Sequence, residues 1–156
     1  MFNDIKITDY KQLNQMLDSL LDEETNKTAN LSNASSLLNY FLDNVNWVGF
    51  YLYEARTDQL VLGPFQGLPA CVRIDNGSGV CGTSFKNQEI LRIEDVHTFP
   101  GHIACDAASN SEIVIPIYKD NLPIGVLDID SPLYNRFTAS DEEGLAEFVE
   151  VLKKHL

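Results

Sequence analysis

Three cysteines are the residues whose type and spacing point most directly to chemistry in this 156-residue chain. They are Cys71, Cys81 and Cys105, and none forms the Cys-x2-Cys pair that marks many structural zinc sites. All three fall in segments that we expect to be loops or the ends of elements. Inert cysteines usually pack inside a strand or helix as small hydrophobic residues. Position alone therefore leaves redox chemistry and inert packing both open for each cysteine.

Carboxylates form a second candidate group. The alternation of side chains along a strand places Asp128 and Asp130 on one face, roughly 6–7 Å apart. Glu112 opens the preceding expected strand, and a tight hairpin makes the two strands neighbours. Acids this close indicate a negatively charged site that takes a cation. A solvated cluster at strand ends is the commoner meaning of such a pattern, and both interpretations stay open.

Aromatic and metal-binding residue types supply the remaining candidates. Trp47 and Tyr51 are four positions apart on one expected strand, so they either line a pocket or pack in the core. His97, His102 and Cys105 are metal-ligand types within one loop. Their spacings, His-x4-His and His-x2-Cys, match no recognised metal motif. We therefore predict no metal site and no cofactor.

The elements that must position these residues follow from the spacing of apolar side chains. Residues 8–24 and 28–44 carry them every three or four positions, which predicts two helices. We expect strands over 47–53, 59–63, 90–93, 113–118 and 122–129, with a brief strand inside 64–82 and a short helix over 79–86. Residues 94–111 read as a long loop, and such loops are often functional. Ser140 with Glu143 fits a capping box that opens a last helix. The order predicts an α+β fold, an antiparallel sheet with helices packed on it.

Charge and hydropathy exclude several function classes. The net charge is −12, from 23 acidic and 11 basic residues, which would repel nucleic acid and anionic membrane surfaces. No apolar run approaches the ~18–20 residues of a membrane span, and the start lacks the pattern of a secretory signal. We therefore expect a cytoplasmic protein without nucleic-acid or membrane partners. In that compartment an odd number of cysteines disfavours a structural disulfide framework.

The segments around the candidate residues resemble one known family. These segments are NWVGFYL at 46–52, LGPFQG at 62–67, GVCG at 79–82, GHIACD at 101–106, SEIVIP at 111–116 and GVLDIDSP at 125–132. They resemble the free methionine-(R)-sulfoxide reductases, which are single GAF domains, and the resemblance runs over nearly the whole chain. It is specific, because the three cysteines at this spacing separate the family from GAF domains that only sense ligands.

The resemblance implies a fold, a reaction and partners. The implied fold is a single GAF domain over residues 1–156, with about six antiparallel strands and helices on both faces. Such domains usually pair as homodimers through their terminal helices. The implied reaction reduces free L-methionine-(R)-sulfoxide to methionine by a cysteine sulfenic acid and disulfide mechanism. A thioredoxin-type dithiol recycles the enzyme.

The resemblance also implies residue roles. Cys105 matches the nucleophile, Cys71 the usual resolving cysteine, and Cys81 an alternative resolving thiol. The residues implied in substrate binding are Glu112, Asp128, Asp130, Trp47 and Tyr51. Two chemical expectations follow. His102 is a candidate to help Cys105 lose its proton. The Cys81 thiolate would be favoured if Cys81 lies near the N-terminus of the short helix.

Two other functions compete with the reductase. A ligand-sensing GAF domain without catalysis is the main alternative, although it would leave three placed cysteines idle. A metal-dependent enzyme built on His97, His102 and Cys105 is the other. An alkylating agent distinguishes the ligand sensor from both enzymes. A chelator distinguishes the metal-dependent enzyme from the thiol enzyme.

Overall fold

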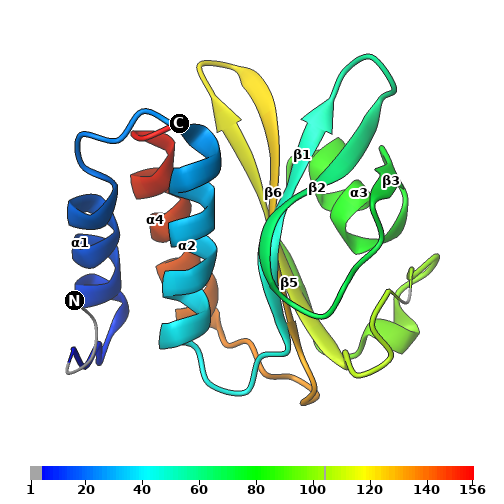
Figure 1. Ribbon diagram of the computed structural model, residues 1–156. Helices are drawn as coiled ribbons and strands as arrows, with labels where there is room; N and C mark the ends of the chain where they lie inside the picture. The colour runs from blue at the N-terminus through cyan, green and yellow to red at the C-terminus, as the bar shows by residue number, and fades with distance from the viewer. Residues whose placement is uncertain (1–4, 104) are drawn as a thin grey trace.

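A six-stranded antiparallel sheet forms the centre of the computed structural model, which describes residues 5–103 and 105–156 (Figure 1). The strand order is β3-β2-β1-β6-β5-β4. The strands are β1 (Trp47–Glu54), β2 (Gln59–Gly67), β3 (Arg73–Asp75), β4 (Leu91–Ile93), β5 (Ser111–Lys119) and β6 (Leu122–Ser131). The helices are α1 (Tyr10–Leu21), α2 (Lys27–Phe41), α3 (Gly79–Asn87), the 3-10 turn η1 (Val96–Thr98) and α4 (Ala139–Lys153). The α+β fold predicted from the sequence is confirmed.

Helices cover both faces of the sheet, as expected. Figure 1 shows α1, α2 and α4 together on one side, with α3 on the other. Helices α1, α2 and α4 place buried apolar residues, such as Leu13 and Leu38, in one core with sheet residues that include Phe50. Helix α3 contributes Val80 and Phe85 to a second, smaller core on the opposite face. The site described below lies on the α3 side.

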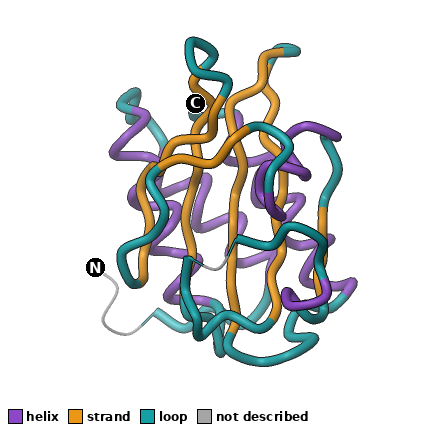
Figure 2. Tube along the Cα trace, turned by 90° about the vertical axis from the view of Figure 1, so that its right-hand side faces the viewer, coloured by secondary structure: helices purple, strands orange, loops and turns teal. Residues whose placement is uncertain are grey.

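Alternation along the strands decides which residue faces which core. On β1, Val48 and Phe50 belong to the core under α1, α2 and α4, whereas Trp47 and Tyr51 belong to the core under α3. A strand turns successive side chains to opposite faces, so this division follows from the sequence order. In Figure 2, which looks from the side of α3, loop segments cross in front of the strands on this face.

Two local predictions differ from the structure. Strand β2 continues to Gly67, beyond the expected end at 63, because its far end pairs with the start of β1. The last helix begins two residues early, at a capping box made by Thr138 and Asp141 instead of Ser140 and Glu143.

In the described part of the chain, no helix is long and apolar enough to span a bilayer.

Candidate active site

A small cavity of about 50 Å³ opens on the α3 face of the sheet, between the sheet and two loops. It gathers every predicted site residue except Cys71 into its lining. Those residues are Trp47, Tyr51, Cys81, Cys105, Glu112, Asp128 and Asp130. They come from β1, α3, β5, β6 and the loop after η1, which shows how the fold brings distant segments together.

Cys71 reaches the same place through a disulfide bond to Cys105. The two Cα atoms lie 5.6 Å apart, although the residues are separated by 34 positions in the sequence. The bond joins the loop between β2 and β3 to the loop between η1 and β5. Cys81 is the free cysteine, and it is buried. The structure therefore pairs the two cysteines that the family resemblance names as nucleophile and resolving partner.

Two aromatic side chains of β1 hold the loop that carries Cys71. The Tyr51 hydroxyl donates a hydrogen bond of 2.9 Å to the carbonyl oxygen of Cys71. The indole Nε1 of Trp47 donates one of 3.2 Å to the carbonyl of Leu68. The Trp47 and Tyr51 rings stack with their centroids 5.7 Å apart. The two residues thus share a face, as predicted, and fix the loop as well as lining the cavity.

A glycine makes room for this aromatic wall. A Cβ atom at Gly49 would lie 2.7 Å from the Trp47 ring and 2.3 Å from the Cβ of Phe65. Phe65 itself stacks on Trp47, with ring centroids 5.1 Å apart. The wall therefore depends on the absence of a side chain between Trp47 and Tyr51.

Asn46 anchors the other loop, a role that the sequence analysis missed. Its Nδ2 donates to Asp106 Oδ2 at 2.9 Å and to Ser109 Oγ at 3.1 Å. Asp106 and Ser109 also line the cavity. In the sequence, Asn46 stands next to Trp47 and Asp106 stands next to Cys105, which marks both as neighbours of predicted site residues. Those positions alone do not show that Asn46 and Asp106 contact each other in the fold.

The carboxylates meet because of the register between β5 and β6. Glu112 pairs with Asp130 and Val114 pairs with Asp128. Residues directly opposite each other in an antiparallel pair point to the same face, so all three acids face the cavity. Glu112 and Asp128 are only 6% and 5% exposed. None of the described residues that line the cavity is a lysine or arginine.

Burial raises the pKa of all three acids. It raises the pKa of Glu112 well above its usual value, and the charges of Asp128 and Asp130 raise it further. Burial and the neighbouring Asp128 also raise the pKa of Asp130. Burial raises the pKa of Asp128, against hydrogen bonds from Glu112 and Cys81 that favour its ionised form. Burial and mutual repulsion therefore favour the protonated forms of these crowded carboxyl groups.

Cys81 lies in the first turn of α3, where the helix dipole would favour a thiolate. The expectation of a favoured thiolate is nevertheless wrong for this structure. Burial raises the pKa of Cys81 well above its usual value, and the charges of Asp128 and Glu112 add to the effect. Its Sγ lies 3.8 Å from Glu112 Oε1, a distance at which the neutral thiol donates a weak hydrogen bond. Desolvation and like charge outweigh the dipole.

In this oxidised form Cys105 is not free to join His97 and His102 as a metal ligand. Cys105 is bonded to Cys71, and His97 Nδ1 lies 2.8 Å from Asp95 Oδ1. His102 lines the cavity, and burial, with the nearby His97, lowers its pKa. A neutral imidazole beside Cys105 fits a proton acceptor better than a cation.

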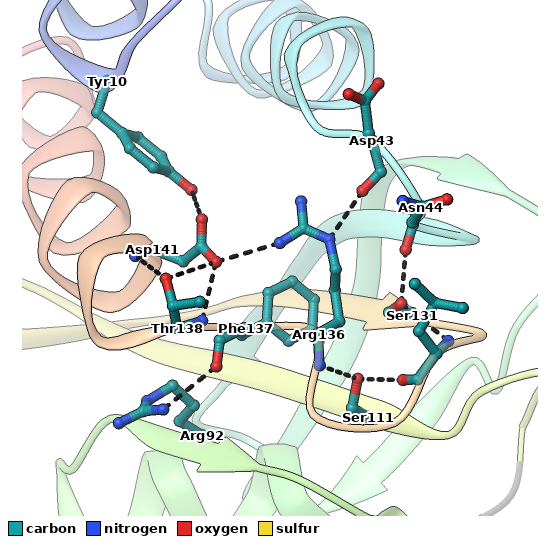
Figure 3. A network of polar contacts seen from close by, with 11 residues as sticks. Tyr10, Asp43, Asn44, Arg92, Ser111, Ser131, Arg136, Phe137, Thr138 and Asp141 are labelled. Carbon is teal, nitrogen blue, oxygen red and sulfur yellow. Dashed lines mark hydrogen bonds and ion pairs between the residues drawn. The ribbon is translucent and has the colours of Figure 1, made fainter.

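A polar network beyond the cavity fixes the ends of β5 and β6 that carry the acids (Figure 3). Ser111 and Ser131 are register partners, next to Glu112 and Asp130. Ser111 Oγ donates to the carbonyl of Leu133 at 2.5 Å and accepts from the Arg136 N–H at 3.3 Å. Arg136 also forms an ion pair with Asp141 of α4 at 3.1 Å. The helical layer thereby holds the strand ends at the site.

Comparisons with known proteins agree with this geometry. The GAF domain family matches residues 16–156. The free methionine-R-sulfoxide reductase of Escherichia coli is 56% identical over 94% of this chain and 88% of its own length. This chain belongs to the free methionine-R-sulfoxide reductase family of GAF domains.

Solved structures of the free methionine-R-sulfoxide reductase family superpose closely on this chain. The reduced form of fRMsr of Staphylococcus aureus is 51% identical, with a TM-score of 0.91 and 99% of both chains covered. The Neisseria meningitidis enzyme in complex with its substrate is 39% identical, with a TM-score of 0.92 over 97% of this chain and 92% of its own. The family and GAF fold expected from the sequence are confirmed.

Proposed function

We propose that this chain reduces free L-methionine-(R)-sulfoxide to methionine by thiol chemistry. The single observation that carries the proposal is the Cys71–Cys105 disulfide, because Cys105 lines the same cavity as Glu112, Asp128 and Asp130. A ligand sensor has no need of a redox-active pair beside its ligand. Relatives that bear the reductase name, at 56% and 42% identity, support the same choice.

The acids supply a physical reason for selecting the free amino acid. Glu112, Asp128 and Asp130 face a cavity whose described lining contains no lysine or arginine, so they favour the α-ammonium of the substrate. A methionine sulfoxide inside a peptide lacks that ammonium and would leave buried carboxyl groups unpaired. Sites built around a polar partner reject analogues that lack it by up to ~10⁴–10⁵. Trp47 and Tyr51 provide an apolar wall for the methyl-sulfoxide end.

The first chemical step transfers the sulfoxide oxygen to Cys105. The Cys105 thiolate attacks the sulfoxide sulfur while a protonated carboxyl group donates to the oxygen, and Glu112 suits this role because its pKa is raised. The protonated oxygen then moves from the substrate sulfur to the Cys105 sulfur, the bond between the two sulfurs breaks, and methionine leaves Cys105 as a sulfenic acid. His102, held neutral by its lowered pKa, is the candidate base for the Cys105 thiol.

The second step forms the disulfide that the structure contains. The Cys71 thiol attacks the Cys105 sulfenic acid, the S–S bond forms and water leaves. A thioredoxin-type dithiol then reduces the disulfide by exchange and is itself oxidised. The raised pKa of Cys81 makes it a poor nucleophile, so we assign Cys71 as the main resolving thiol and Cys81 as the alternative.

The same proposal includes the setting of the enzyme. We infer a cytoplasmic enzyme that works as a homodimer with one GAF domain, extending over residues 1–156, in each subunit. Size-exclusion chromatography with light scattering measures the oligomeric state directly.

The test of this function compares substrates. Wild-type protein with dithiothreitol is given the free R epimer, the free S epimer and a peptide that contains methionine sulfoxide, and methionine formation is measured. We expect consumption of the free R epimer alone. Equal consumption of the peptide would show that the acids do not select the free amino acid. If no substrate is consumed, the protein is not a reductase and the ligand-sensing function is the remaining candidate.

A further inference from the structure

Three potential metal ligands converge at the base of the cavity. The Sγ of Cys81 and one oxygen each of Glu112 and Asp128 lie within 4.8 Å of one another. They come from α3, β5 and β6, and all three residues are buried. Over residues 5–103 and 105–156, no other three His, Cys, Asp or Glu side chains bring their donor atoms so close together.

One oxygen within this cluster lacks a hydrogen-bond partner, which is a second sign that a ligand binds here. Asp128 Oδ1 is buried and accepts no hydrogen bond from the described residues. An unpaired buried oxygen is costly, and such atoms usually mark a place where an ion, water or ligand binds. The described cavity lining offers no lysine or arginine to pair with this oxygen.

We propose that the oxidised protein, with Cys71 and Cys105 joined, binds one divalent metal ion of the zinc class through Cys81, Glu112 and Asp128. One sulfur and two oxygens suit zinc, whereas magnesium and calcium take oxygen ligands alone. Bond lengths of ~2.3 Å to sulfur and ~2.0–2.2 Å to oxygen put tetrahedral ligand atoms roughly 3.3–3.8 Å apart. Side-chain movements of about 1 Å would complete the site.

The space beside the ligands fits a small hydrated ion. A cavity of about 50 Å³ holds a few water molecules. One water would complete the tetrahedral shell. Binding converts the Cys81 thiol to a thiolate and releases its proton to solvent. The proposal does not rest on the reductase activity, so either can fail while the other stands.

Cobalt(II) reports directly on a thiolate ligand, because a sulfur-to-cobalt charge-transfer band appears only when the thiolate binds. Oxidised protein is titrated with cobalt under conditions that keep the Cys71–Cys105 bond intact, which leaves Cys81 as the free thiol. We expect one equivalent to bind with the charge-transfer band and tetrahedral visible bands. Zinc should displace the cobalt and abolish them.

Variants locate the ion. Cys81→Ser should remove the charge-transfer band and weaken zinc binding by more than ~10-fold, because even residues outside the metal ligands commonly contribute 10–100-fold. Asp128→Asn should weaken binding as well while leaving the thiol in place. His97→Ala, outside the cavity lining, should bind like wild type. Circular dichroism verifies that each variant is folded.

Three outcomes would overturn the proposal. One is the absence of a charge-transfer band in the wild type. Another is a band that persists in Cys81→Ser. The third is zinc binding that falls in His97→Ala and not in either cavity variant, which would place the ion on the surface histidine.

Discussion

Glu112 of β5 and Asp130 of β6 are direct cross-strand partners, with Asp128 two residues along on the same face. Like charges directly opposite each other destabilise a sheet. The described cavity lining supplies no lysine or arginine to offset them. The fold therefore holds acids that repel each other when ionised at the place where the substrate ammonium is proposed to bind. The effect of this repulsion on stability and on substrate binding can be measured.

Removing the charge of Glu112 should stabilise the oxidised protein. Its pKa is raised in the folded state, so between the ordinary glutamate pKa and the raised value the folded protein binds more protons than the unfolded chain. Stability therefore falls as pH rises through that interval. We expect Glu112→Gln to raise the free energy of unfolding by ~1–3 kcal/mol near pH ~7, with little difference below pH ~4.

Urea denaturation at the two pH values measures this difference. Glu143→Gln, an exposed position on α4, is the matched control and should change little at either pH. A Glu112→Gln protein that is less stable than wild type at neutral pH would show that the carboxyl group of Glu112 does not destabilise the folded protein.

Asp128→Asn should raise the KM for free methionine-(R)-sulfoxide by about 10-fold or more, since a tenfold change corresponds to the loss of ~1.4 kcal/mol of binding. The matched comparison is N-acetyl-methionine sulfoxide, which has no ammonium. Its weak turnover should not worsen in the variant. If the KM for the free amino acid is unchanged, Asp128 does not bind the ammonium.

Tyr51→Phe should slow the second chemical step more than the first. The hydroxyl that this change removes donates to the Cys71 carbonyl, so the loop carrying the resolving thiol loses its anchor. We expect a longer-lived Cys105 sulfenic acid, trapped by dimedone and measured by mass spectrometry. Tyr53→Phe is the control, because Tyr53 lies on the same strand and its hydroxyl donates to Asp58 in the turn between β1 and β2. Equal trapping in both variants would contradict the anchoring role.

Exposed apolar residues beside the disulfide should matter to a protein reductant and not to a small one. Leu68 lies three positions before Cys71 and Val72 directly after it, and they are 65% and 61% exposed. Exposed apolar side chains beside a reactive bond favour contact with a partner protein. We expect Leu68→Ser with Val72→Ser to lower the thioredoxin-driven rate several-fold and to leave the dithiothreitol-driven rate unchanged.

Leu122→Ser provides the matched surface control for that comparison. Leu122 is 64% exposed at the hairpin between β5 and β6, and it lies outside the cavity lining. A similar loss of the thioredoxin-driven rate in this variant, or an unchanged rate in the double variant, would show that the partner docks elsewhere.

Local pattern in the sequence predicted much of the fold and part of the site. The period of apolar residues predicted α1 and α2, and the aromatic and β-branched composition of residues 47–53 predicted β1. Strand alternation correctly placed Asp128 and Asp130 on one face. The three-residue strand β3 is too short to carry a periodic signal, so its bounds could not be predicted.

Long-range pairing was the part that local pattern could not supply. The partner of Glu112 depends on the register between β5 and β6, and the anchor from Asn46 to Asp106 joins residues 60 positions apart. The behaviour of Cys81 was mispredicted because its helix position was visible in the sequence and its burial among carboxyl groups was not.

A single turnover without reductant tests the central claim most directly. Fully reduced wild-type protein is mixed with one equivalent of the free R epimer, and methionine and remaining thiols are counted. The account predicts one methionine per chain, a new Cys71–Cys105 disulfide and an intact Cys81 thiol, with no methionine from Cys105→Ser. Methionine formed by Cys105→Ser, or a disulfide that consumes Cys81 in the wild type, would contradict it.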